Sequence, residues 1–160
     1  MKRLAILLIA VSVIGCSTQP MSPNVRTAKE GSQVEHPVIR TPLTEVGTNG
    51  NDDLVAPFSR FQQDTAYGLN GRDELYGDSG DDELYGGNGQ DRILGDSDED
   101  YIVGGKGWDY LSGNAHADTI EAADGQKDDV YCGNGKRDRA SVDKEDTVKG
   151  CETVNGKPAK

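Results

Sequence analysis

The chain has 160 residues, enough for one folded domain at most, and 28 acidic against 17 basic residues give it a net charge of −11. This balance argues against nucleic acid and against an anionic membrane surface as partners, because both would repel the protein. Glycine is frequent, with 21 residues. The composition therefore favours a glycine-rich acidic domain that needs cations to neutralise it.

The first fifteen residues are predicted to be an export signal. Lys2 and Arg3 precede an apolar run over residues 4–14, which is too short to span a bilayer comfortably. The sequence VIGC at residues 13–16 resembles the lipobox of bacterial lipoproteins. This resemblance implies cleavage before Cys16, lipidation of that cysteine, and anchoring to the bacterial cell envelope, facing the periplasm or the exterior. An ordinary signal with a chance cysteine is the alternative.

Residues 16–46 are interpreted as the lipidated N-terminus and a disordered tether. They are rich in Ser, Thr and Pro and show little aliphatic periodicity. A flexible segment of this length has a root-mean-square reach of about 30 Å. We therefore expect it to hold the following domain away from the membrane.

A nine-residue repeat begins after the tether. Each unit starts with a glycine, carries an aspartate five residues later and an aliphatic residue seven residues later. The six clean units start at Gly68, Gly77, Gly86, Gly95, Gly104 and Gly113. The first six residues of a unit favour tight turns, and the last three alternate around one aliphatic side chain as a short strand does. Two units therefore make one 18-residue coil, and imperfect units extend the pattern over residues 47–140.

The unit resembles the nonapeptide G-G-x-G-x-D-x-U-x, with U aliphatic, of the RTX or hemolysin-type calcium-binding repeat family. The resemblance covers residues 47–140 and implies an all-β fold, a right-handed parallel β-roll of about five 18-residue coils. Some units depart from the pattern. Asp98 and His116 replace the fourth-position glycine, where we expect looser turns or different coordination. The second glycine is replaced by Leu69, Asp78, Asp96 and Asn114.

The resemblance also implies several Ca²⁺ ions between adjacent turns, bound by the aspartates and by turn carbonyls. Turns on the same side are two units apart. The aspartates then form two ladders, namely Asp52, Asp73, Asp91, Asp109 and Asp128, and Asp64, Asp82, Asp100, Asp118 and Asp138. The carbonyl ligands are expected around Gly71, Gly80, Gly87, Gly89, Gly105 and Gly107. Carboxylates in strands about 4.8 Å apart repel one another without a cation, and oxygen ligands in a flexible loop suit calcium better than magnesium or zinc.

The expected core is thin, because each coil buries only two aliphatic side chains against the entropy of ordering 18 residues. We therefore expect the calcium-free chain to be largely unfolded and calcium to fold it. An EF-hand loop starting at Asp96 is an alternative, but Tyr101 and Gly107 stand where glycine and glutamate are needed. A disordered Gly/Asp-rich linker is the other alternative, and the aliphatic residue in phase with every aspartate argues against it.

Residues 141–160 leave the pattern and are interpreted as a C-terminal cap and tail. If Cys16 carries lipid, Cys132 and Cys151 remain as an even pair in an oxidising compartment, where a disulfide can persist. A zinc site is the alternative, but His36 and His116 lack finger-like spacing to these cysteines. A disulfide closing this loop would contribute about 3 kcal/mol and cap the open end of the roll.

No catalytic constellation stands apart from the aspartate ladders, so we expect no enzyme. The tyrosines Tyr67, Tyr76, Tyr85, Tyr101, Tyr110 and Tyr131 are expected on the outer sheet faces, either stacking there or contacting a glycan or protein. The sequence favours a calcium-binding, surface-anchored lipoprotein with a structural, adhesive or interaction role. The alternative is a glycan- or protein-binding β-solenoid in which calcium is purely structural.

Overall fold

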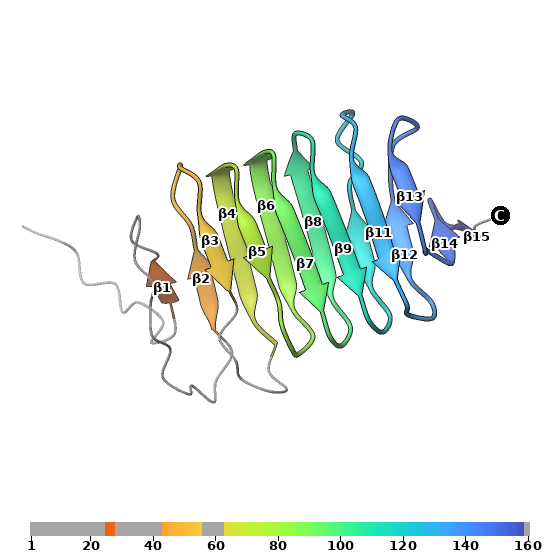
Figure 1. The fold of residues 1–160 in the computed structure, drawn as a ribbon, viewed down its shortest axis with the longest axis horizontal. Helices are drawn as coiled ribbons and strands as arrows, with labels where there is room; N and C mark the ends of the chain where they lie inside the picture. Colours follow the sequence, from red (N-terminus) through yellow and green to blue (C-terminus); the bar gives the residue numbers. More distant parts are fainter. Residues whose placement is uncertain (1–24, 28–42, 56–62, 159–160) are drawn as a thin grey trace, which may run out of the picture.

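The structure, a computed structural model, describes residues 25–27, 43–55 and 63–158. In these ranges the chain forms a parallel β-solenoid of about six turns, with strands alternating between two sheets that face each other (Figure 1). The predicted all-β parallel roll with 18-residue spacing is confirmed, with about six coils where about five were expected. The described ranges hold no helix long and apolar enough to cross a membrane.

One sheet has nine strands and the other has six. In spatial order the nine-stranded sheet contains β1 (Val25–Thr27), β2 (Thr44–Val46), β4 (Thr65–Gly71), β6 (Glu83–Gly89), β8 (Tyr101–Lys106), β10 (Thr119–Glu121), β12 (Arg139–Ser141), β14 (Thr153–Val154) and β15 (Lys157–Pro158). The six-stranded sheet contains β3 (Asp53–Val55), β5 (Glu74–Tyr76), β7 (Arg92–Asp96), β9 (Tyr110–Asn114), β11 (Asp129–Gly133) and β13 (Thr147–Lys149). Neighbouring strands pair in parallel except β14 and β15, which are antiparallel.

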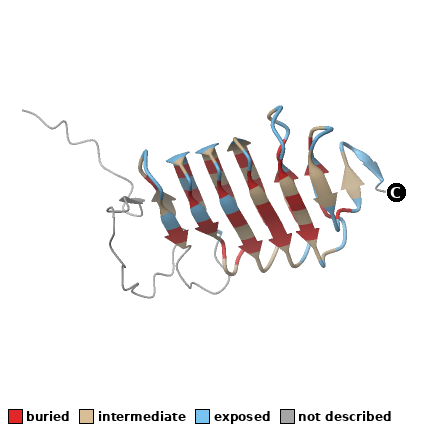
Figure 2. Cartoon of the chain, turned by 45° about the horizontal axis from the view of Figure 1, so that its top comes forward, coloured by how far each residue is buried: buried red, intermediate tan, exposed pale blue. Residues whose placement is uncertain are grey.

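The strand register follows the repeat. Leu84 pairs with Ile102 in the nine-stranded sheet, and Ile93 pairs with Leu111 in the six-stranded sheet, so equivalent positions of successive coils face one another. The strands from β3 to β12 each point an aliphatic side chain inward between two outward ones, as the period-2 alternation predicts. These residues form the core, with at most 5% of their surface exposed: Leu54, Leu75, Ile93, Leu111 and Val130 from one sheet, and Ala66, Leu84, Ile102, Ile120 and Ala140 from the other. Figure 2 shows the burial concentrated in the central strands.

The ladder of parallel strands extends beyond residues 47–140 at both ends. Residues 44–46 form β2, which pairs with β4, and the segments after Ala140 form β13 and β14. At the C-terminal end the strands continue because two short sequences repeat the acid–polar–aliphatic order of the units, namely Asp146-Thr147-Val148 and Glu152-Thr153-Val154. The segment interpreted as a cap therefore contributes a further coil before β15 ends the sheet.

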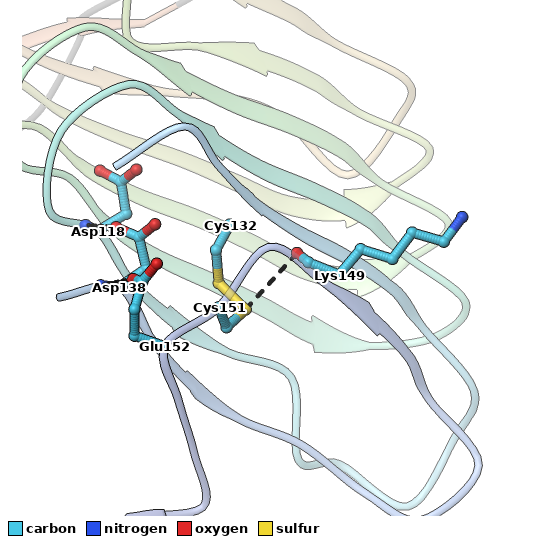
Figure 3. The surroundings of a disulfide bond; sticks show 6 residues. All are labelled: Asp118, Cys132, Asp138, Lys149, Cys151 and Glu152. Carbon is cyan, nitrogen blue, oxygen red and sulfur yellow. Dashed lines mark hydrogen bonds between the residues drawn. A yellow bond between two sulfur atoms is a disulfide. The ribbon is translucent and has the colours of Figure 1, made fainter. Parts of the chain in front are cut away.

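The disulfide between Cys132 and Cys151 is present, with 5.0 Å between the two Cα atoms. It joins β11 to the segment between β13 and β14, and both cysteines are buried in the core (Figure 3). Cys16 and most of the proposed tether lie outside the described residues.

Candidate calcium-binding ladders

Two rows of turns connect the sheets, one along each side of the solenoid. The first turn row leads from the nine-stranded to the six-stranded sheet and contains residues 47–52, 68–73, 86–91, 104–109, 122–128 and 142–146. The second turn row leads back, and its described turns contain residues 77–82, 95–100, 113–118, 132–138 and 150–152. Each turn ends at the acidic residue that precedes a strand, so all the acidic positions of one row lie on the same side.

The turns need a left-handed backbone, which glycine adopts without strain. Gly87 and Gly89 have φ of 112° and 145°. Where glycine is replaced the conformation persists: Leu69, Asp98 and His116 have φ of 82°, 81° and 77°. Asp98 and His116 thus keep a positive φ, but their values lie well below the 122–145° of the fourth-position glycines Gly71, Gly80, Gly89 and Gly107. At Asp98 the backbone N–H also donates to Nδ1 of His116 at 3.1 Å.

The aspartates form the two predicted ladders through a specific hydrogen bond. Oδ1 of Asp91 accepts the backbone N–H of Asp73, one coil earlier on the same side, at 2.9 Å. The same bond recurs along both rows at 2.7–3.0 Å. The first ladder contains Asp52, Asp73, Asp91, Asp109, Asp128 and Asp146, and the second contains Asp64, Asp82, Asp100, Asp118, Asp138 and Glu152.

Asp146 and Glu152 are ladder members that the sequence analysis missed. Oδ1 of Asp146 accepts from the N–H of Asp128, and Oε2 of Glu152 accepts from the N–H of Asp138. Figure 3 shows the carboxylates of Asp118, Asp138 and Glu152 following one another in successive coils. A usable signal existed for Asp146, which lies 18 residues after Asp128. Glu152 lies only 14 residues after Asp138, so no fixed period would have found it.

The second carboxylate oxygen of the ladder aspartates is buried and has no hydrogen-bond partner. This holds for Oδ2 of eight residues: Asp73, Asp82, Asp91, Asp100, Asp109, Asp118, Asp128 and Asp138. None of these residues has more than 3% of its surface exposed. Buried polar atoms in proteins are almost always paired, and an unpaired buried charge is strongly destabilising. Eight such oxygens in two rows suit a cationic partner.

Burial also makes ionisation of these carboxyls unfavourable. It raises the pKa of Asp100 to about 9 and the pKa values of Asp82 and Asp118 to about 7. The backbone N–H donated to each carboxylate acts in the opposite direction, and the charges of neighbouring ladder carboxylates raise the pKa further. The pKa values of Asp64, Asp73, Asp91, Asp109, Asp128 and Asp138 are raised too.

Backbone carbonyl oxygens of the adjacent coil border the same small region as Oδ2. A Cβ added to Gly68 would lie 2.6 Å from Oδ2 of Asp73 and 2.5 Å from the carbonyl oxygen of Gly86. At Gly77 the corresponding distances are 2.7 Å to Oδ2 of Asp82 and 2.5 Å to the carbonyl oxygen of Gly95. Glycine at the first position thus leaves a small region bordered by a carboxylate and a carbonyl oxygen of successive coils.

This donor set fits calcium, which prefers carboxylate and carbonyl oxygens in flexible geometry. Among the described residues no three His, Cys, Asp or Glu side chains are grouped to hold a metal. Carbonyl oxygens would therefore have to supply part of the coordination, as the sequence analysis expected for the turn glycines. The aspartates stand where the prediction put them, and their role as calcium ligands stays a prediction.

Comparison with known proteins identifies the repeats. A family model described as RTX calcium-binding nonapeptide repeat (4 copies) matches residues 63–93 and 94–126. Residues 63–126 are therefore RTX calcium-binding nonapeptide repeats, as the sequence resemblance implied. Such repeats bind Ca²⁺, and in a β-solenoid they imply a structural role for the ions. No curated protein and no solved structure matches the chain.

The raised pKa values predict how the calcium-free chain responds to pH. When burial raises the pKa of a carboxyl above its ordinary value of 3.8, the folded chain binds the proton more tightly than the unfolded chain does. The carboxyl then contributes stability that is fully present below pH 3.8. For Asp82, Asp118 and Asp128 this contribution is lost as the pH rises through about 7. The calcium-free chain should therefore show more β structure by circular dichroism at about pH 5.5 than at about pH 8. A spectrum that stays the same between these pH values would contradict the prediction.

Replacing one ladder carboxylate should have opposite effects with and without calcium. Asp100→Asn removes a buried ionisable group, so it should stabilise the calcium-free fold at neutral pH. With calcium bound it removes a ligand charge and should lower the free energy of unfolding by about 1.4 kcal/mol at tenfold excess over Kd. Denaturant unfolding in both conditions measures this. Glu99→Gln is the matched control, because Glu99 is the neighbouring acid and is exposed. The same sign of change in both conditions for Asp100→Asn would refute a ligand role.

Proposed function

We propose that this chain is a calcium-binding lipoprotein of the bacterial cell envelope whose β-roll folds when several Ca²⁺ ions bind between its turns. The observation that supports this most directly is the two rows of buried Oδ2 atoms without partners. Their neutralisation removes the repulsion within each ladder and the unfavourable burial of charge together.

The chain's own residues prepare the ion sites. Each Oδ1 is fixed by a backbone N–H of the neighbouring coil, which leaves Oδ2 turned toward the carbonyls of the turn. Bound calcium supplies the positive charge that these oxygens require. Binding sites built from two successive coils do not exist in the unfolded chain, so binding and folding are coupled. Calcium-binding modules outside the cell have Kd values of about 10⁻⁴ to 10⁻³ M, so such a fold forms at millimolar calcium.

The cellular role that we propose is structural, adhesive or interactive, without catalysis. Cys16 would carry the lipid, and the residues between it and β2 would connect the anchor to the solenoid, with residues 25–27 paired along β2 as β1. Anionic partners are disfavoured by the net charge of −11. An alternative function is a glycan- or protein-binding module in which calcium is only structural. The tyrosines on the sheet surfaces support that alternative.

Calcium should fold the chain, and this is the central test. In millimolar calcium we expect a β-type circular dichroism spectrum, and excess chelator should convert it to that of a largely unfolded chain. Calorimetric titration of the chain should show clearly more than about three ions bound, since each ladder offers several successive carboxylates. Heat consistent with fewer ions, or a β signal that chelator leaves unchanged, would overturn the proposal.

Lipidation should depend on Cys16. Expressed in bacteria, the full chain should partition into detergent with the membrane fraction, and its mass should show a lipid adduct on a chain that begins at Cys16. The Cys16→Ala variant should lose both properties, while Ser17→Ala should keep them. If the Cys16→Ala variant still carried lipid or stayed with the membrane, the lipoprotein interpretation would fail.

A further inference from the structure

The outer face of the nine-stranded sheet carries an aromatic row. Tyr67 of β4 and Tyr85 of β6 occupy paired positions, and their rings stack with centroids 4.9 Å apart and planes 9° from parallel. Tyr101 of β8 lies diagonal to Tyr85 and meets it edge to face, with centroids 6.1 Å apart. The three rings form one surface, which we call the tyrosine platform, and Tyr67 is 36% exposed.

A groove of about 460 Å³ with mixed polar and apolar lining adjoins the platform. It lies over β10, β12 and β14, and Tyr101 borders it because this residue pairs with Thr119 of β10. Glu121 links the two regions, since it interacts with the hydroxyl of Tyr101 and also lines the groove. The polar side chains along the groove are Thr119, Glu121, Arg139, Ser141, Thr153 and Asn155.

The tyrosines of the six-stranded sheet are arranged differently. The guanidinium of Arg92 lies 4.7 Å from the ring centroid of Tyr110, and the ammonium of Lys149 lies 5.1 Å from that of Tyr131. The hydroxyl of Tyr76 donates to Glu74. Tyr110 and Tyr131 also pack against each other, with centroids 5.2 Å apart, but a cation of the protein lies over each of these two rings. Among the described residues no such cation lies over Tyr67, Tyr85 or Tyr101 on the nine-stranded sheet, where Tyr67 remains exposed and a groove lies beside the row.

We propose that the tyrosine platform and the adjoining groove bind a neutral glycan chain. A sugar ring offers an apolar C–H face that stacks on tyrosine, and hydroxyls that both donate and accept hydrogen bonds. The groove supplies matching groups, with Glu121 as an acceptor, Arg139 as a planar donor, and hydroxyls at Thr119, Ser141 and Thr153. From β4 to β12 there are four strand steps, about 19 Å, so the surface is long enough for several sugar rings.

The charge of the surface selects the class of glycan. Glu83 stands in the same outward row as Tyr101, and Glu121 lines the groove, so two carboxylates face one cation of the groove, Arg139. Together with the net charge of −11, these carboxylates repel uronate- or phosphate-bearing polymers. A neutral polysaccharide meets no such repulsion. The inference rests on the proposed function, because the platform exists only when calcium has folded the coils.

Affinity electrophoresis of the full chain in millimolar calcium tests the proposal. The gels contain dextran, mannan or hydroxyethylcellulose as neutral polysaccharides, and hyaluronate as an anionic one. We expect at least one neutral polysaccharide to retard the chain and hyaluronate to leave it unaffected. Tyr85→Ala should weaken the retardation about tenfold, and Tyr85→Phe should preserve it because the stacking ring remains. Glu121→Gln should weaken it as well, while Tyr110→Ala, the matched change on the opposite sheet, should stay within about twofold.

Calcium-induced circular dichroism of each variant is recorded first, so that folding and glycan binding are separated. A chain that folds with calcium but is retarded by none of the neutral polysaccharides would overturn the inference and leave the proposed function intact. Equal losses for Tyr110→Ala and Tyr85→Ala would overturn it too, and so would retardation by hyaluronate. If Tyr85→Ala does not fold, the Glu121→Gln and Tyr85→Phe variants, which keep nearly the same side-chain volume, test glycan binding in its place. If the chain binds no glycan but self-associates in sedimentation, and Tyr85→Ala abolishes that self-association, the surface contacts a second copy of the chain instead.

Discussion

The hydrogen bond from the backbone N–H of one ladder residue to Oδ1 of the next is the interaction on which the structure depends. It joins successive coils at the point where turn becomes strand, and it recurs from Leu43 to Glu152. Because one carboxylate oxygen is used in this way, the other is fixed in orientation and buried. The same side chain thus links the coils and holds an oxygen ready for a cation.

Glycine at the start of each unit is a consequence of this arrangement. In the six clean units there is no room for a Cβ on the first glycine, because Oδ2 of the aspartate five residues later approaches too closely, joined at Gly68, Gly77 and Gly86 by a carbonyl of the next coil. Within the turns, Gly89 and Gly107 have no room for a Cβ either, because a carbonyl of the preceding coil lies against them, although leucine, aspartate, asparagine and histidine adopt positive φ at other turn positions. The irregular units show that the first position can change, since Ala122 and Cys132 occupy it there.

The nine-residue spacing indicated the inward aliphatic residues, and the family resemblance that it carries implied the parallel roll and the two ladders. The disulfide was predicted separately, from the even pair of cysteines that remains if Cys16 is lipidated. The hydrogen bond made by Oδ1 could not be predicted, because it depends on the position of the side chain relative to the neighbouring coil. Glu152 was missed because it lies only 14 residues after Asp138, whereas Asp146 keeps the 18-residue spacing from Asp128 and could have been found by it. The difference between the two tyrosine-bearing faces could not be predicted either, because it depends on Arg92 and Lys149, which lie over tyrosine rings of neighbouring strands.

The disulfide makes the two ends of the solenoid unequal in stability. In a stack of coils each coil is stabilised mainly by its two neighbours, so loss of structure starts at an end. Cys132 and Cys151 tie the last coils together, whereas no disulfide joins the described residues at the start of the roll. When calcium is withdrawn, the coils around β3 and β4 therefore come apart first, and the order of loss runs from the N-terminal end toward the disulfide. Unfolding is therefore directional, from the N-terminal coils toward the C-terminal coils that the disulfide joins.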